Sequence, residues 1–373
     1  MKKFYVLFWL LVMSVFVACD PVKTDPPEFV HRDKTVLVYM VANNNLSSQA
    51  ESNLSAMKQG FVPEEDNLLV YMHLSNKTPI LLRIYKDNRG AIMQDTVYRF
   101  PAQNSSDSKS LQSVLKVTRT MYPANQYGLV LWSHGTGWLP EGYYSKSFGS
   151  DAGKEMDVKD LAASLPFRME FVLFDACLMG GVEVAYELKD SVNYVISSPA
   201  EILSQGFPYS RIMQHVYSTP MELGKVAEEY YEFYNSKSGS MRSATISMVK
   251  CSALEALAEE TSKIIAEYKG NMSNVDTLSI QKYYRGKKHW FYDFGNYISE
   301  LSGGNDSEFR KALDAAVVYK AATPNFLEVV IDPEKFCGLS TYIPSPTADP
   351  ELLKYYSNFK WSKDTGYLAP EGE

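Results

Sequence analysis

FVLFDACLMG, residues 171–180, is a strand-like segment that runs directly into reactive side chains. Its leading apolar residues are typical of a strand buried on both faces of a parallel sheet, and Asp175 and Cys177 follow where this strand would end. Residues 129–135, LVLWSHG, have the same pattern, in which an apolar run is followed by His134. In open parallel sheets, ligands bind at the carboxyl ends of the strands. The two segments therefore predict a site that contains both Cys177 and His134.

The segments around this pair alternate between strand and helix patterns, which indicates crossover units and a mostly parallel central sheet flanked by helices. The expected class is therefore α/β, with a catalytic domain over 35–250 and a more helical C-terminal region, with two late strands, over 251–373. The expected strands are 35–42, 67–74, 80–85, 91–100, 127–132, 170–175, 192–197, 244–249, 326–331 and 338–343. The expected helices are 47–58, 108–122, a short one that opens at 157, 180–188, 221–234, 253–268, 294–301 and 308–320.

The N-terminus has the pattern of an export signal. Residues 2–3 are lysines, and residues 4–17 form an apolar run that is too short to span a bilayer. The run leads into FVAC, which resembles the lipobox of bacterial lipoproteins, with Cys19 as the lipidated residue. We expect residues 1–18 to be a lipoprotein signal peptide, residues 19–34 a tether, and the protein to be exported and lipid-anchored at the outer membrane or cell surface. Ordinary secretion, with Cys19 incidental, is the alternative.

The composition excludes several classes of function. The chain has 373 residues, of which 45% are hydrophobic, and its net charge of -7 argues against a nucleic-acid-binding surface. Its five histidines lack metal-ligand spacing, and no glycine-rich nucleotide loop is present, so we expect no metal and no cofactor. Beyond Cys19, three cysteines do not make a disulfide framework. A bridge between Cys251 and Cys337 is open, and it would leave Cys177 alone.

His134 and Cys177 lie 43 positions apart, about one crossover unit, so neighbouring strands would bring them together. Such a pair suits a thiol hydrolase, in which the thiolate attacks a carbonyl and the imidazole gives a proton to the leaving amine. A helix that opens after Cys177 would favour the thiolate. Gly135 would let its N–H and that of Cys177 face the oxyanion. Either reactive residue alone is more often a core residue, but their joint placement favours catalysis.

Residues 133–138, SHGTGW, and 174–180, FDACLMG, resemble the two signature segments of the clostripain family of cysteine peptidases, which has a caspase-like fold. The resemblance covers nearly all of the chain after residue 35. It implies a catalytic dyad of His134 and Cys177. It also implies an oxyanion site formed by the backbone N–H groups of Gly135 and Cys177, and cleavage after Arg or Lys.

We expect Asp175 to recognise the basic side chain of the substrate. Residues i and i+2 of a strand share a face, so Asp175 would point to the side of Cys177, and a carboxylate there would pair with a guanidinium or an ammonium group. The alternative is a structural aspartate that binds backbone N–H groups. The resemblance places Ser197, Ser198 and Glu201 along one pocket wall, with Phe207 where many relatives have Trp.

The resemblance also implies activation by cleavage of the loop between the catalytic strands, here residues 139–156. Lys146 and Lys154 are its candidate self-cleavage sites, and two solvated lysines are the alternative. Calcium dependence occurs in the family, but the chain has no D-x-D-x-D-G loop. The loop and the residues just after it hold an acidic group that we expect to be solvated: Asp151, Glu155 and Asp157.

Together these observations predict a surface-anchored cysteine endopeptidase that cuts after Arg or Lys. Its expected partners are polypeptides with basic residues, and a membrane through the lipid anchor, but no nucleic acid. One alternative is a non-catalytic lipoprotein that keeps the fold and binds peptides or glycans, a hypothesis that the 26 tyrosines suggest. Another is a hydrolase of non-peptide amides with the same dyad.

Overall fold

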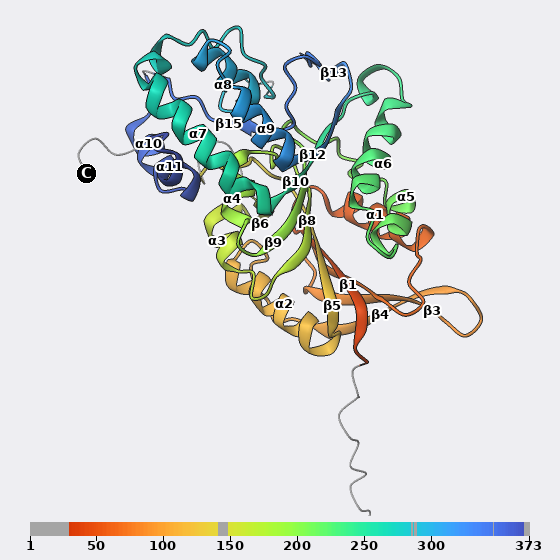
Figure 1. Cartoon of the computed structure of the whole chain (residues 1–373). Helices are drawn as coiled ribbons and strands as arrows, with labels where there is room; N and C mark the ends of the chain where they lie inside the picture. The colour runs from red at the N-terminus through yellow and green to blue at the C-terminus, as the bar shows by residue number, and fades with distance from the viewer. Residues whose placement is uncertain (1–29, 141–147, 285, 287–288, 346, 369–373) are drawn as a thin grey trace, which may run out of the picture.

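The computed structural model describes residues 30–140, 148–284, 286, 289–345 and 347–368. Their central feature is a nine-stranded sheet (Figure 1). In sheet order its strands are β12 (Val317–Ala322), β10 (Thr245–Lys250), β9 (Val192–Ser197), β8 (Met169–Asp175), β5 (Ala124–Trp132), β1 (Arg32–Ala42), β2 (Asn67–Leu74), β3 (Ile80–Lys86) and β4 (Ile92–Arg99). The five strands from β9 to β2 are parallel, and antiparallel strands extend both edges. The predicted α/β, caspase-like class is confirmed.

Helices cover both faces of the sheet and thereby bury the central strands on both sides. Leu37, Tyr39 and Val41 of β1 face one apolar core, and the residues between them face the other, as the two-residue period of a strand requires. In Figure 1 the first core lies to the left of the sheet and the second to the right. The helices of the second core are α1 (Ser47–Gln59), α5 (Tyr209–Val216) and α6 (Leu223–Asn235). Those of the first core are α2 (Ser108–Met121), α3 (Val158–Ala163), α4 (Val182–Leu188), α7 (Leu254–Tyr268), α8 (Phe294–Ser302), α9 (Ser307–Ala316), α10 (Pro350–Tyr356) and α11 (Lys360–Thr365).

The C-terminal region differs from the prediction at its late strands. The helix expected over 308–320 ends at Ala316, and the chain continues as β12, which pairs antiparallel with β10. The β-branched and aromatic run 317–319 suits a strand better than a helix. The late strands expected over 326–331 and 338–343 are two-residue ladders instead. These are β13 (Asn325–Phe326) with β14 (Val329–Val330), and β11 (Tyr292–Asp293) with β15 (Ser340–Thr341).

Other predictions about the chain's organisation have mixed outcomes. β1 begins at Arg32, so the last residues of the expected tether belong to the sheet, because they pair with β5. Cys251 and Cys337 are buried free thiols, so the bridge left open between them does not form. The expected signal peptide and Cys19 lie outside the described residues. Within the part of the chain that the structure covers, no helix is long and apolar enough to cross a membrane.

Candidate active site

The site is built on the carboxyl ends of β5 and β8, which are adjacent and parallel. Trp132 lies opposite Asp175 in their register, and the N–H of Ser133 donates to the carbonyl of Asp175 at 3.3 Å. His134 and Cys177 each follow two residues after this Trp132–Asp175 pair, so the structure brings their segments together as predicted. A side chain at Gly135 would not fit, because its Cβ would lie 2.7 Å from the carbonyl oxygen of Cys177.

Cys177 lies in a tight turn rather than at the start of a helix. Leu178 has a φ of 62°, in the left-handed region that side-chain-bearing residues rarely adopt, and its N–H donates to the carbonyl of Ala200 at 2.9 Å. Since α4 begins only at Val182, the prediction of a helix that opens directly after Cys177 is wrong. The thiol instead meets a backbone amide: the N–H of Ile202 donates to Sγ at 3.3 Å, and Cys177 is half-buried.

His134 has a partner that the sequence did not reveal. Its Nε2 lies 2.8 Å from Oδ1 of Asn45, and its carbonyl accepts from the N–H of Gly149 at 3.0 Å. The sequence shows residues 43–45 only as three asparagines that end a strand. They follow β1, which is the neighbour of β5 in the sheet, and that order could not be read from local pattern.

Asp175 is buried, and one of its oxygens is occupied. Oδ2 accepts from the N–H of Phe207 at 3.1 Å and from the hydroxyl of Tyr209 at 2.8 Å. Burial raises the pKa of this carboxyl to about 6, although both hydrogen bonds act to lower it. Within the described part of the chain, Oδ1 accepts no hydrogen bond. Asp175 therefore binds a backbone N–H, as the structural alternative expected, through Oδ2.

Most of the residues expected to form the pocket wall have buried side chains. Ser197 and Ser198 lie at the end of β9, and the hydroxyl of Ser198 is 2.7 Å from that of Thr245. The ring of Phe207 is buried and lies 4.4 Å, between centroids, from that of Tyr230 on α6. Of this group, Glu201 keeps a partly exposed side chain. A wall here would thus be formed by backbone at Ser197, Ser198 and Phe207, and by a side chain at Glu201.

Comparisons with known proteins show the family of the chain. A model of the clostripain family matches residues 38–368. The chain belongs to the clostripain family. The curated clostripain of Hathewaya histolytica is 24% identical over 219 residues, which are 49% of this chain and 42% of that protein. The aligned region therefore spans less than half of that relative.

Two solved members of the clostripain family are similar over almost their whole length. An inactive zymogen C11 protease from Parabacteroides distasonis is 32% identical, with a TM-score of 0.81 over 90% of this chain and 98% of that chain. A secreted C11 cysteine protease from Bacteroides thetaiotaomicron, solved in complex with an irreversible peptide inhibitor, is 30% identical. Its TM-score is 0.80 over 90% of this chain and 99% of that chain.

The loop that would be processed in this clostripain-family chain contains a hairpin of β6 (Phe148–Asp151) and β7 (Lys154–Met156). Lys154 is exposed on β7, and Lys146 lies outside the described residues. Asp151 is buried, and its Oδ2 lies 2.9 Å from Nδ1 of His73. Burial acts to raise the pKa of Asp151, but hydrogen bonds from His73, the N–H of Ser105 and Asn43 hold it below its usual range.

The expectation of a solvated acidic group is therefore wrong for Asp151. It is also wrong for Asp157, which caps α3 and accepts from the hydroxyl of Tyr355 at 2.5 Å. The chain folds back over the loop, so polar groups distant in sequence reach both carboxylates. In the described ranges no three His, Cys, Asp or Glu side chains converge as metal ligands, and the absence of a cofactor stays a prediction.

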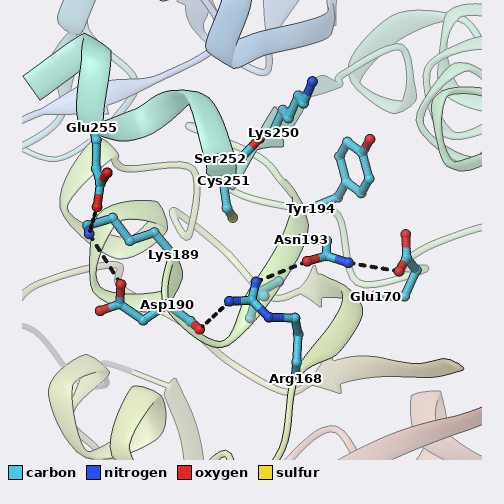
Figure 2. Close-up of a pocket in the computed structure, with 11 residues that line it drawn as sticks. Arg168, Glu170, Lys189, Asp190, Asn193, Tyr194, Lys250, Cys251, Ser252 and Glu255 are labelled. Carbon is cyan, nitrogen blue, oxygen red and sulfur yellow. Dashed lines mark hydrogen bonds and ion pairs between the residues drawn. The ribbon is translucent and has the colours of Figure 1, made fainter. Parts of the chain in front are cut away.

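A separate hollow of about 470 Å³ lies beside the amino ends of β8 and β9 (Figure 2). Its polar side chains bind one another: Lys189 pairs with Asp190 and Glu255, and Arg168 donates to the amide oxygen of Asn193. Burial raises the pKa of the Cys251 thiol in its wall to about 12, so this thiol stays protonated at neutral pH. The hollow lies at the opposite end of the strands from Cys177, and we assign it no part in the chemistry.

Proposed function

We propose that this protein is a cysteine endopeptidase that hydrolyses peptide bonds after Arg or Lys, with Cys177 as nucleophile and His134 as general acid and base. The observation that carries the proposal is the register of β5 and β8, which sets both residues two positions beyond one cross-strand pair. The Cys177 thiolate attacks the scissile carbonyl carbon, and His134 gives its proton to the amine as the C–N bond breaks. Water then attacks the thioester carbon and gives a proton to His134, and as the C–S bond breaks the carboxylic acid is released and the Cys177 thiolate is restored beside protonated His134.

The tetrahedral oxyanion would be stabilised by the backbone N–H groups of Gly135 and Cys177. The close approach of Gly135 to the carbonyl of Cys177 supports this role, because it keeps the two peptide segments in contact and admits no side chain. We expect the glycine to be required at this position for both reasons.

Asp175 is our proposed reader of the basic side chain. A carboxylate with one oxygen fixed by protein donors is held in orientation, and the other oxygen is left for an ammonium or guanidinium group. We propose that Ser197, Ser198, Glu201 and Phe207 surround the same pocket, the buried ones through their backbone. The second solved relative, a secreted cysteine protease with a bound peptide inhibitor, is in keeping with an exported enzyme that acts on polypeptides. Lipid anchoring through Cys19 belongs to the same proposal.

The non-catalytic alternative drew on the many tyrosines as a binding surface. In the described residues, however, many tyrosines are among the largest fully buried side chains: Tyr39, Tyr71, Tyr209, Tyr230, Tyr234, Tyr283, Tyr297, Tyr356 and Tyr367. These rings build the cores and are not offered to a ligand. We therefore favour the catalytic function.

The test uses the chain from Pro21 onward with fluorogenic peptides that end in Arg, Lys, Asp or Leu. We expect cleavage of the Arg and Lys peptides only, and a loss of about 10⁴-fold or more in kcat/KM for Cys177→Ala. Cys251→Ala is the matched control, since it removes a thiol away from the site, and it should keep turnover. Full activity of Cys177→Ala would exclude the proposed nucleophile. If the intact chain is silent, the same assay after light trypsin treatment tests for a precursor.

A further inference from the structure

We propose that Asn45 is a positioning residue that orients His134 for proton transfer. The inference rests on the roles proposed above for His134 and Cys177. Oδ1 of Asn45 lies 2.8 Å from Nε2 of His134, within hydrogen-bond distance. An amide oxygen only accepts, so Nε2 carries the proton in this pair. The neutral ring then has its lone pair on Nδ1, and Nδ1 is the atom that would exchange a proton with the thiol or the leaving amine.

Asn45 is held in place by the two asparagines before it. The side-chain amide of Asn44 donates to the carbonyls of Val41 at 3.1 Å and Ser150 at 2.6 Å, and its Oδ1 accepts from the N–H of Leu46 at 2.8 Å. Asn43 donates to the buried carboxylate of Asp151 at 2.7 Å. These bonds fix the backbone on both sides of Asn45. An exposed side chain on a fixed turn can orient a ring with little loss of entropy on binding.

Strand β6, which contains Ser150 and Asp151, also binds the backbone of His134. The N–H of Gly149 donates to the carbonyl of His134 at 3.0 Å, and the next residue, Ser150, receives the amide of Asn44. One short strand thus sets the backbone of the histidine and the turn that carries its hydrogen-bond partner. The relative position of Asn45 and His134 is therefore determined by the fold and not by the two side chains alone.

This geometry gives Asn45 a role throughout the reaction. When His134 takes the thiol proton, Nε2–H remains bonded to Oδ1, and the new proton resides on Nδ1. Asn45 is neutral, so it selects the tautomer and the ring orientation without adding charge. A carboxylate at this position would select the tautomer and the ring orientation and would also add a negative charge. That charge would favour the imidazolium form of His134.

The experiment compares Asn45→Ala, Asn45→Asp and a control, Asn125→Ala. Asn125 is also an exposed asparagine bonded to a side chain, Asp33, but it lies at the amino end of β5, away from the site. With the Arg peptide we expect kcat to fall about tenfold to a hundredfold in Asn45→Ala, with KM little changed. Asn45→Asp should recover part of kcat and raise the pKa of the His134 ring by about one unit or more, followed by NMR of the labelled imidazole. Asn125→Ala should match the wild type in both.

The two readouts separate this inference from the proposed function. If the wild type cleaves no peptide but Asn45→Asp still raises the ring pKa of His134, the pairing stands and the function fails. If the wild type is active and Asn45→Ala keeps its kcat, the positioning role is wrong. A rise in KM alone would also overturn it, because it would make Asn45 a substrate contact. An unchanged ring pKa in Asn45→Asp would show that the bond does not form in solution.

Discussion

Asp175 couples the proposed specificity to pH at the level of one carboxyl group. Burial raises its pKa to about 6, and only the ionised form pairs with a cationic side chain. We therefore expect KM for the Arg and Lys peptides to fall about tenfold as the pH rises from about 5 to 7, since the ionised fraction rises by about that factor. The measurement is KM against pH for each peptide.

Asp175→Asn is the control for this prediction. Its amide can keep an oxygen toward Phe207 and Tyr209 but has no charge to gain, so KM for the Arg peptide should be high and flat across the same range. A wild-type KM that is equally flat would show that Asp175 does not read the substrate charge.

Individual residues also show how far sequence reasoning reaches. Cys177 and His134 could be found because each follows an apolar strand whose burial is local information. Asn45 could not, because its partner is 89 residues away and the pairing depends on β1 lying next to β5. The neighbours of Asp175 could not be identified for the same reason: Phe207 and Tyr209, which belong to the second core, lie 32 and 34 residues away along the chain.

At the scale of elements, the β6–β7 hairpin distinguishes the two candidate self-cleavage sites, because Lys154 lies within the hairpin and Lys146 precedes it in the sequence. Lys154 is paired in register with the buried Asp151, so a protease would have to open the hairpin before it could bind Lys154 in an extended form. We expect processing after Lys146 instead. Lys146→Ala should abolish it, and Lys154→Ala, the matched control, should not. Intact-mass analysis of the purified chains reports the new termini, and a fragment that ends at Lys154 would contradict the prediction.

The elements that were predicted wrongly are those decided by distant partners. The helix expected after Cys177 starts late because the N–H groups of Leu178 and Gly180 donate to carbonyls of residues 200 and 198, not within a helix. The sequence predicts a helix through β12 because α9 leads into it without a break, whereas in the structure β12 pairs with β10. The parallel strands themselves were predictable, since burial on both faces leaves a continuous apolar run.

At the scale of the whole molecule, Glu183 joins the two regions that the sequence divided at residue 250. It lies on α4, and its Oε1 accepts from the hydroxyl of Thr341 at 2.9 Å, the N–H of Tyr342 at 3.0 Å and the hydroxyl of Tyr356 at 2.6 Å. Oε2 is buried with no partner in the described part of the chain. Burial raises the pKa of Glu183, against the effect of these bonds, so the protonated form is the one that the fold favours. The C-terminal elements therefore complete the first core rather than form a body of their own.

Two substitutions at Glu183 test this join. Glu183→Gln keeps an oxygen for the three donors, whereas Glu183→Leu leaves the donors of Thr341, Tyr342 and Tyr356 buried without an acceptor. At about 1 kcal/mol or more for each, Glu183→Leu should lower the free energy of unfolding by about 3 kcal/mol relative to Glu183→Gln. Because the folded-state pKa is raised, the stability due to protonated Glu183 is lost as the pH rises through it, and Glu183→Gln should lack that loss. Urea unfolding over a series of pH values measures both effects. Equal stability of the two variants would mean that the C-terminal region is held by apolar packing alone.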